Sequence, residues 1–407
     1  MLSPGFLAFT DQAVVSGCNF LTALLLARTL PDDAFGHYSL AFMVCLFYSS
    51  LHRALFTQPL AVLTHPEQPQ LLLARLQSLI RAHWVAIPIG AILLGASAWY
   101  FFPDLAVLLA GIVYLGCFLL QETIRRYEYA ARRLSSALSN DLISYGGQLV
   151  LLAMLAAVDA LTAATAFIAM ALSSLAAFFI SLYRTGPIHP DSQNHLSVQK
   201  LFNEHWPLAK WLMVTTLAVW GAVQVYPFLM APLGPVAVAA FSACRNPLNA
   251  LGLVVQSVSN YLPIVATSVL HHGGKHGLKR HFIQTSMLAA LIGAAFVFAI
   301  HWLAGPLLSF LYGGRYDHAA SILKILSFGT ASSLLGVVFG AYALALHDSR
   351  SGFLSNLGAS IVTFTIGMWL IGTEGMHGAA LGTALSLATA ALLQGGFVIH
   401  RLSRMPN

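Results

Sequence analysis

The sequence predicts an all-α polytopic membrane protein with about twelve transmembrane helices in two six-helix bundles. Hydrophobic residues make up 58% of the chain and charged residues only 8%, and the mean hydropathy is +0.76, which is far more apolar than an ordinary soluble domain. The apolar residues fall in stretches of about 20 or more, the length that a helix needs to cross a bilayer. Basic residues are concentrated in alternate connections, as in multi-pass membrane proteins.

Proline, glycine and clustered charges separate the apolar stretches and so predict the ends of the helices. The eighth and tenth stretches exceed the length that a bilayer requires, which predicts that these helices tilt, bend or protrude. The twelve predicted spans are 7–30, 37–63, 79–102, 104–126, 136–158, 161–183, 207–231, 235–269, 282–305, 319–346, 352–372 and 376–400.

Lysine and arginine predict the orientation of the helices, because basic residues mark the cytoplasmic side. The other set of connections, near residues 32, 104, 159, 233 and 374, has almost no basic residues, Arg315 being the exception. Both termini are therefore predicted to be cytoplasmic, in agreement with an even number of helices. The basic residues of the predicted cytoplasmic set include Arg75, Arg81, Arg125, Arg126, Arg132, Arg133, Arg184, Lys200, Lys275, Lys279, Arg280, Arg350, Arg401 and Arg404.

The longest polar connection, residues 185–205, divides the chain into an N-terminal lobe of residues 1–184 and a C-terminal lobe of residues 206–407. Each lobe begins and ends on the predicted cytoplasmic side, so the two lobes could be parallel repeats about an axis along the membrane normal. Within this cytoplasmic linker, Val198 to Trp206 forms either a short interfacial helix or a flexible segment with one helical turn.

Five of the twenty basic residues lie outside the cytoplasmic set: Arg28, Arg53, Arg245, Arg315 and Lys324. Arg53 and Arg245 fall in the second predicted helix of each lobe, where an arginine costs roughly 2.5–3.5 kcal/mol on insertion scales and needs a partner, a wet cavity or a substrate. If these side chains project into one space between the lobes, they form a cationic interior. Guanidinium groups hold phosphate oxygens bidentately, which favours a phosphate-containing substrate.

Each of these residues also has a structural interpretation. Arg28 and Lys324 lie near predicted outer helix ends and could instead extend to the lipid headgroups. Arg53 and Arg245 could instead form buried pairs with an acidic residue or with helix carbonyls.

The acidic residues available for such pairs are Asp11, Glu122 and Asp141. Asp11, in the first predicted helix, could instead bind a coupling proton or sodium ion. For Asp141, close to the predicted cytoplasmic edge, an interfacial cap is the interpretation that we favour.

The chain carries few signs of catalysis or of a metal site. Its outer connections are mostly too short for a catalytic domain. The four cysteines fall in apolar stretches without metal-ligand spacing, and a solvated glycine-rich turn accounts for His271, His272 and His276. We therefore expect no enzyme activity, no metal and no cofactor other than a coupling H+ or Na+ gradient.

Glycine and proline residues inside the spans indicate packing and bending. Two pairs of glycines at i, i+4 spacing predict faces for close helix approach, Gly336 with Gly340 and Gly378 with Gly382. Prolines inside the predicted spans predict kinks. These prolines are Pro59, Pro227, Pro247 and Pro263.

Short motifs occur throughout the chain: Asp11 to Gly17 with Asn19-Phe20, Ala27 to Leu30, Phe35-Gly36 and Gln58-Pro59 in the first half, and Arg245 to Asn249 and Asn260 to Pro263 in the second. These motifs resemble those of the Wzx-like polysaccharide flippases of the multidrug/oligosaccharidyl-lipid/polysaccharide exporter superfamily. The resemblance implies a V-shaped, two-lobed bundle with a central cavity, working by alternating access in a bacterial cytoplasmic (inner) membrane.

The resemblance also implies a function, the transfer of a polyprenyl-diphosphate-linked oligosaccharide from the inner to the outer leaflet for O-antigen or exopolysaccharide assembly. Arg53 and Arg245 would bind the diphosphate, and Arg28 and Lys324 would guide the headgroup. The implied partners are the lipid-linked saccharide, membrane lipids and a polysaccharide polymerase with its export machinery, and no nucleic acid. The alternatives are a drug or organic-cation antiporter of the same superfamily and a membrane-embedded enzyme of envelope assembly.

Overall fold

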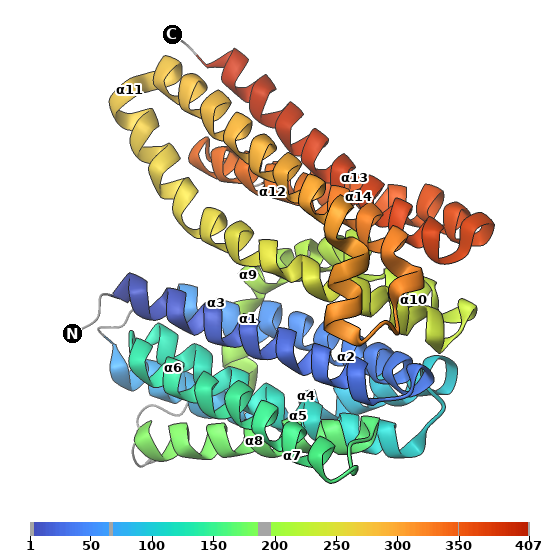
Figure 1. Cartoon of the computed structure of the whole chain (residues 1–407). Helices are drawn as coiled ribbons and strands as arrows, with labels where there is room; N and C mark the ends of the chain where they lie inside the picture. The colour runs from blue at the N-terminus through green and yellow to red at the C-terminus, as the bar shows by residue number, and fades with distance from the viewer. Residues whose placement is uncertain (1–3, 65–67, 186–196, 349, 406–407) are drawn as a thin grey trace. The chain divides into compact units, whose positions relative to one another are not determined.

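The computed structural model describes residues 4–64, 68–185, 197–348 and 350–405, and every regular element in these ranges is a helix (Figure 1). Among the described residues, nine stretches are long and apolar enough to cross a membrane. Large apolar side chains such as Trp84 and Trp99 point outward and are exposed, as expected of a surface that faces lipid. The predicted all-α membrane fold is confirmed, whereas the V shape and the central cavity stay predictions.

Two of the nine stretches, Tyr261–Tyr312 and Arg350–Arg404, are long enough to cross twice, and each is interrupted at a glycine. Gly274 has φ 57° and ψ −158°, and Gly375 has φ 58° and ψ −126°. Glycine adopts this backbone region because it lacks a Cβ. When the two long stretches are divided at these glycines, the described residues form twelve long helices.

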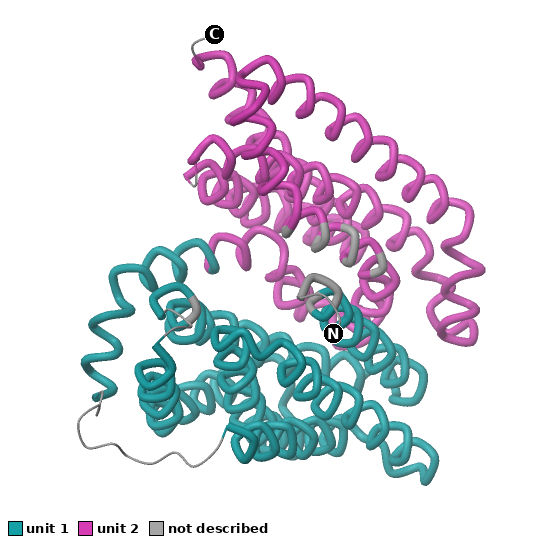
Figure 2. Tube along the Cα trace, turned by 90° about the vertical axis from the view of Figure 1, so that its left-hand side faces the viewer, with its two compact units in different colours: residues 1–216 teal, residues 217–407 magenta. Residues whose placement is uncertain are grey.

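The chain divides into two compact units, Met1–Thr216 and Leu217–Asn407 (Figure 2). In unit 1, α5 packs against α8, α4 and α2. The helices of unit 1 are α1 (Pro4–Thr29), α2 (Asp32–His52), α3 (Gln58–Leu63), α4 (Pro69–Phe101), α5 (Leu105–Ala130), α6 (Leu134–Asp141), α7 (Gly147–Ala157) and α8 (Ala163–Thr185), with π turns at Arg53–Thr57 and Leu142–Gly146.

In unit 2, α12 packs against both α11 and α14, and α14 packs against α13. Helix α9 (Val198–Val219) crosses the boundary between the units. The other elements are α10 (Tyr226–Leu229), α11 (Pro235–Tyr312), α12 (Ala320–Ala345), α13 (Arg350–Val362) and α14 (Met368–Arg404), with π turns at Trp220–Gln224 and Thr363–Gly367 and short 3-10 turns at Ala231–Leu233 and Asp317–Ala319.

Two of the predicted proline kinks take the form of π turns. Pro59 and Pro227 are the second residues of α3 and α10, two and three positions after the last residue of a π turn. Proline lacks the N–H that would bond to the carbonyl four residues earlier, and a π turn accommodates that missing bond. Pro247 and Pro263, in contrast, lie within α11 and have no non-helical residue beside them. The break in α11 is at Gly274.

Val198 to Trp206 is the first part of the longer helix α9, which differs from both structures predicted for this segment. The segment is neither a separate interfacial helix nor a flexible segment with a single turn, because α9 runs from Val198 through Pro207 to Val219. Its Leu201 is buried in a leucine cluster of unit 1, which gives this end of the helix an apolar anchor. The first part of the predicted linker, residues 186–196, lies outside the described residues.

Buried polar contacts also hold the start of α9 on unit 1. Arg75 of α4 donates from Nη2 to Glu204 Oε2 at 3.0 Å and from Nη1 to the Leu63 carbonyl at 2.8 Å. His205, the next residue along α9, is fully buried and lies just before the predicted span 207–231. Burial and, to a smaller extent, the nearby Arg75 lower the pKa of His205 to about 4, although Glu204 acts in the opposite direction.

The lowered pKa of His205 predicts a loss of stability in acid. The unfolded state binds the proton near pH 6.5 and the folded state only near pH 4, so this contribution to stability is full above pH 6.5 and falls as the pH drops toward 4. At pH 5 the loss amounts to roughly 2 kcal/mol. Thermal midpoints in detergent at pH 5 and pH 7.5 measure this loss of stability. The difference between the two midpoints should be smaller in a His205→Gln variant. An equal difference in the variant would show that other groups cause the acid sensitivity.

The glycines of the two predicted pairs differ in how closely neighbouring atoms approach them. A Cβ on Gly382 would lie 2.8 Å from the Tyr226 hydroxyl and 3.0 Å from Gly367 Cα, and one on Gly378 would meet the Leu370 backbone, as predicted for close packing. Gly336 faces Ala391 at an ordinary 3.6 Å. The prediction is wrong for Gly340, which has nothing within 4 Å and lines a cleft of about 400 Å³.

We therefore expect Gly382→Ala to destabilise the protein by about 1–3 kcal/mol, because the added methyl group overpacks its site. Gly340→Ala is the matched control and should leave stability unchanged or raise it by up to about 1 kcal/mol, because its site is open and alanine favours the helix. Thermal unfolding of the purified proteins in detergent compares the two variants. Equal midpoints would show that the neighbours of Gly382 move to accommodate the added methyl group without cost.

Candidate functional site

Arg53 lies at the edge of a buried charge network in unit 1. It is the first residue of the π turn after α2, and its Nε is 3.5 Å from Glu122 Oε1 of α5. Its side chain is 43% exposed, whereas that of Glu122 is only 3% exposed. Of the three acidic partners considered from the sequence, Glu122 is the one that Arg53 contacts.

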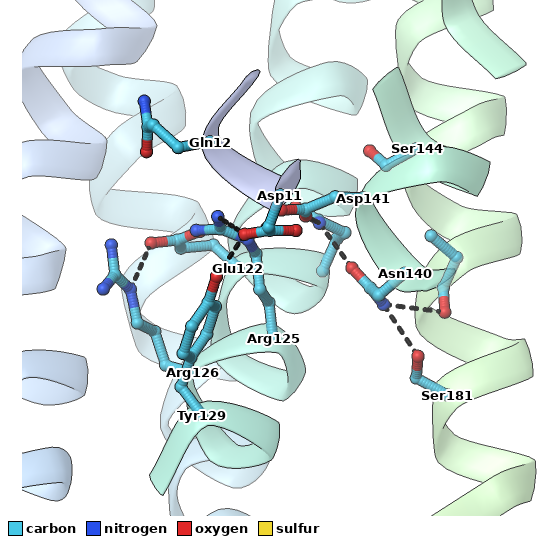
Figure 3. A network of polar contacts seen from close by, with 12 residues as sticks. Asp11, Gln12, Glu122, Arg125, Arg126, Tyr129, Asn140, Asp141, Ser144 and Ser181 are labelled. Carbon is cyan, nitrogen blue, oxygen red and sulfur yellow. Dashed lines mark hydrogen bonds and ion pairs between the residues drawn. The ribbon is translucent and has the colours of Figure 1, made fainter. Parts of the chain in front are cut away.

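Arg125 is the centre of this network (Figure 3). Its Nε lies 2.7 Å from Asp141 Oδ2, its Nη1 3.4 Å from Glu122 Oε2 and its Nη2 3.1 Å from Asp11 Oδ2. The Tyr129 hydroxyl also donates to Asp11. Three carboxylates thus surround one buried guanidinium group, which joins α1, α5 and α6.

Two sequence interpretations are corrected by this arrangement. Arg125 is not part of a solvated cytoplasmic connection, because it lies within α5 and only 10% of its side chain is exposed. Asp141 is not an interfacial cap, because it is fully buried in its ion pair with Arg125. In the sequence, Glu122 is spaced i, i+3 from Arg125 and i, i+4 from Arg126, which predicts ion pairs of Glu122 with both arginines on one helix face.

A second layer of hydrogen bonds fixes the network to α8. Asn140 donates to Ser181 Oγ at 2.8 Å (Figure 3). Asn140 also donates to the Ala177 carbonyl at 3.1 Å, and Gln121 donates to Asn140 Oδ1 at 2.6 Å. Buried polar groups are costly unless they are hydrogen-bonded. These contacts therefore hold Asp141, the neighbour of Asn140, in a fixed position.

The network is balanced in formal charge. Asp11, Glu122 and Asp141 supply three carboxylates, and Arg53, Arg125 and Arg126 supply three guanidinium groups. Asp11 retains one buried oxygen, Oδ1, without a hydrogen-bond partner among the described residues. A coupling cation at Asp11 would therefore share this carboxylate with Arg125.

Arg245 has a different environment in unit 2. It lies in α11, is half-buried, and donates from Nη2 to Gln224 Oε1 at 2.6 Å. Its guanidinium carbon is 6.0 Å from the centre of the Phe241 ring. No carboxylate of the described residues forms an ion pair with Arg245, so its charge lacks the compensation that Arg53 and Arg125 have.

The structure does not bring Arg28 close to Arg53. Arg28 is exposed in the last turn of α1, while Arg53 follows α2, which begins at Asp32. The 21 residues of α2 span roughly 30 Å, so the two arginines lie at opposite ends of this helix pair. Lys324 lies half-buried near the start of α12.

Arg245 and Lys324 lie at the same end of the α11–α12 pair. Cys244 Sγ, next to Arg245, is 3.4 Å from the carbonyl of Ala319, directly before α12. No group of three or more potential metal-ligating side chains occurs among the residues that the structure describes. His271, His272 and His276 are exposed around the break at Gly274.

Comparisons with known proteins identify the fold. Residues 212–370 match the family model described as MatE. A multidrug resistance MATE family transporter of the MOP superfamily, solved in an inward-facing conformation, aligns with 99% of this chain and 95% of its own, at 14% identity and a TM-score of 0.66. The chain has the fold of the MOP-superfamily transporters.

Two further structures share this fold. The lipid II flippase MurJ, in an inward closed conformation, covers 97% of this chain and 89% of its own at 13% identity, with a TM-score of 0.71. A MOP superfamily transporter from Pyrococcus furiosus, described as having a binding pocket of reversed polarity, covers 98% and 94% at 12% identity, with a TM-score of 0.66. A search of curated protein sequences finds no match.

These proteins are transporters and a flippase rather than enzymes, and the chain is a multi-pass membrane protein of that fold. At such low identity the likeness covers the fold alone. The substrate has to be argued from the side chains of this chain.

Proposed function

We propose that this protein is a flippase that moves a polyprenyl-diphosphate-linked oligosaccharide from the inner to the outer leaflet by alternating access. The observation that carries the proposal is the environment of Arg245, a charge within an apolar helix with an amide and an aromatic ring as its contacts. A charge in a membrane helix is costly when it is not compensated, and an anionic substrate would supply the compensation.

Arg53 supports the same function from unit 1. Glu122 holds it on one side, while 43% of its side chain remains exposed and available to an anion. In the predicted orientation, α2 enters from the outside, so Arg53 lies in the cytoplasmic half and would capture the diphosphate from the inner leaflet. Arg28 and Lys324 would then guide the headgroup outward.

The proposal includes a location and partners. The protein would act in the cytoplasmic membrane of a bacterium with both termini inside, and would deliver its product to a polymerase and export machinery for O-antigen or exopolysaccharide assembly. The lipid II flippase MurJ, which has the same fold, supports a lipid-linked substrate.

If transport is coupled to a proton or sodium gradient, Asp11 is the proposed site. It is a buried carboxylate with one oxygen free of hydrogen bonds to the described residues. Binding of a cation there would compete with Arg125, whose Nη2 already contacts the other oxygen at 3.1 Å. The ion would thus act on the same network that holds Arg53.

Expression in a bacterium that lacks its own oligosaccharide flippase tests the function. Restored polysaccharide at the cell surface, without added resistance to cationic dyes, is the expected result. Dye resistance without restored polysaccharide would favour the antiporter instead. An Arg245→Ala variant at equal membrane abundance should not restore polysaccharide.

A further inference from the structure

Two arginines of unit 1 converge on one oxygen of Glu122. Arg53 Nε, from the π turn after α2, lies 3.5 Å from Oε1, and Arg126 Nε, from α5, lies 2.8 Å from the same oxygen. Arg125 contacts the other oxygen, Oε2. The side chains of Arg53 and Arg126 therefore meet at the edge of the network, although they come from different helices.

Exposure separates this pair from Arg125. The side chains of Arg53 and Arg126 are 43% and 31% exposed, against 10% for Arg125. Arg125 uses Nε and both terminal nitrogens on carboxylates, whereas Arg53 and Arg126 face Glu122 through Nε. No described residue accepts a hydrogen bond from their terminal nitrogens, which are the atoms that form bidentate bonds with phosphate oxygens.

We propose that Arg53 and Arg126 form a diphosphate-binding pair within unit 1, with Glu122 as the positioning residue that holds both. Two guanidinium forks match the two phosphoryl groups of a diphosphate, whereas a monophosphate engages one fork fully. Glu122 is shared among three guanidinium groups, so it orients Arg53 and Arg126 through Nε and leaves their terminal nitrogens to phosphate oxygens. The proposal rests on the proposed function for its biological substrate and adds Arg126 to the site.

Binding of small anions to the purified full-length protein in detergent tests the pair. Isothermal titration with inorganic diphosphate and inorganic phosphate, at low ionic strength, should give a clear preference for the diphosphate in the wild type. Arg126→Gln should lower the affinity for diphosphate by about 10- to 100-fold and remove the preference. Arg126→Lys should give an intermediate affinity, because the charge remains while the fork is lost.

Glu122 variants test the positioning role through the same preference. Glu122→Gln keeps an oxygen that accepts the hydrogen bond of Arg126 Nε and lies beside Arg53 Nε, so the preference for diphosphate should persist. Glu122→Leu should reduce that preference while both arginines are still present. A loss in both variants, or in neither, would contradict the positioning role.

Arg133→Gln is the matched control, because it removes one positive charge from an exposed position just after α5. It should leave the diphosphate preference unchanged. Size-exclusion elution and thermal midpoints establish that every variant is folded. The pair is refuted if the wild type binds no diphosphate, if Arg126→Gln keeps the wild-type preference, or if Arg133→Gln lowers it equally.

Transport measured on the same proteins separates the two proposals. If wild-type protein does not flip a lipid-linked oligosaccharide in liposomes but shows the Arg126-dependent preference, the proposed function fails and the diphosphate pair stands. If the wild type flips the lipid and Arg126→Gln matches it in both assays, the pair fails and the function stands.

Discussion

Replacing Arg125 with leucine is expected to destabilise the folded protein by about 3–5 kcal/mol, because three carboxylates lose their shared buried partner. Asp141 is fully buried and cannot recover the interaction with water. Since the stability of a whole domain is only about 5–15 kcal/mol, a large drop in folded yield should follow. Membrane abundance, size-exclusion elution and the thermal midpoint measure it.

Arg133→Leu is the control for this variant, because it removes the same charge from an exposed position. It should elute and melt as the wild type does. If Arg125→Leu also melted within a degree or two of the wild type, the network would not be the structural centre of unit 1.

Replacing Arg245 or Arg53 with alanine is expected to lower transport of the lipid-linked oligosaccharide by at least about 100-fold, because each loses bidentate bonds to the diphosphate. Membrane insertion should be preserved, since Arg245 contacts an amide and Arg53 lies at the exposed edge of its network. Initial transport rates in liposomes, normalised to reconstituted protein, measure the effect.

Lysine at either position should retain part of the activity, because the charge remains without the planar fork. Arg315→Ala serves as the control, since Arg315 also lies outside the predicted cytoplasmic set but in the turn between α11 and α12. Normal transport in both Arg245→Ala and Arg53→Ala would remove these residues from the substrate path.

Much of the fold could be predicted because a membrane imposes simple rules. The apolar stretches corresponded to helices, and the predicted gaps at 270–281 and 373–375 contain the two glycine breaks, Gly274 and Gly375. The position of the unit boundary within α9 could not be predicted, because Leu201 and Glu204 contact residues that are far away in the sequence, such as Leu60 and Arg75.

The candidate site was predicted in part for a similar reason. An arginine inside an apolar run is visible in the sequence, so Arg53 and Arg245 could be selected. Arg125 lies near a helix end, where the rule for cytoplasmic charges applies equally well to a solvated side chain. Its pairing with Asp11, 114 residues earlier, follows from the packing of α1 against α6 beside α5.

The most direct test of the account reconstitutes the purified protein in liposomes with a labelled polyprenyl-diphosphate-oligosaccharide. Access of the label to an impermeant external reagent is followed with and without a proton or sodium gradient. The account predicts protein-dependent transfer of the label that Arg245→Ala abolishes, and any gradient dependence should disappear in Asp11→Asn. Transfer equal to that of protein-free liposomes, or transfer unaffected by Arg245→Ala, would contradict it.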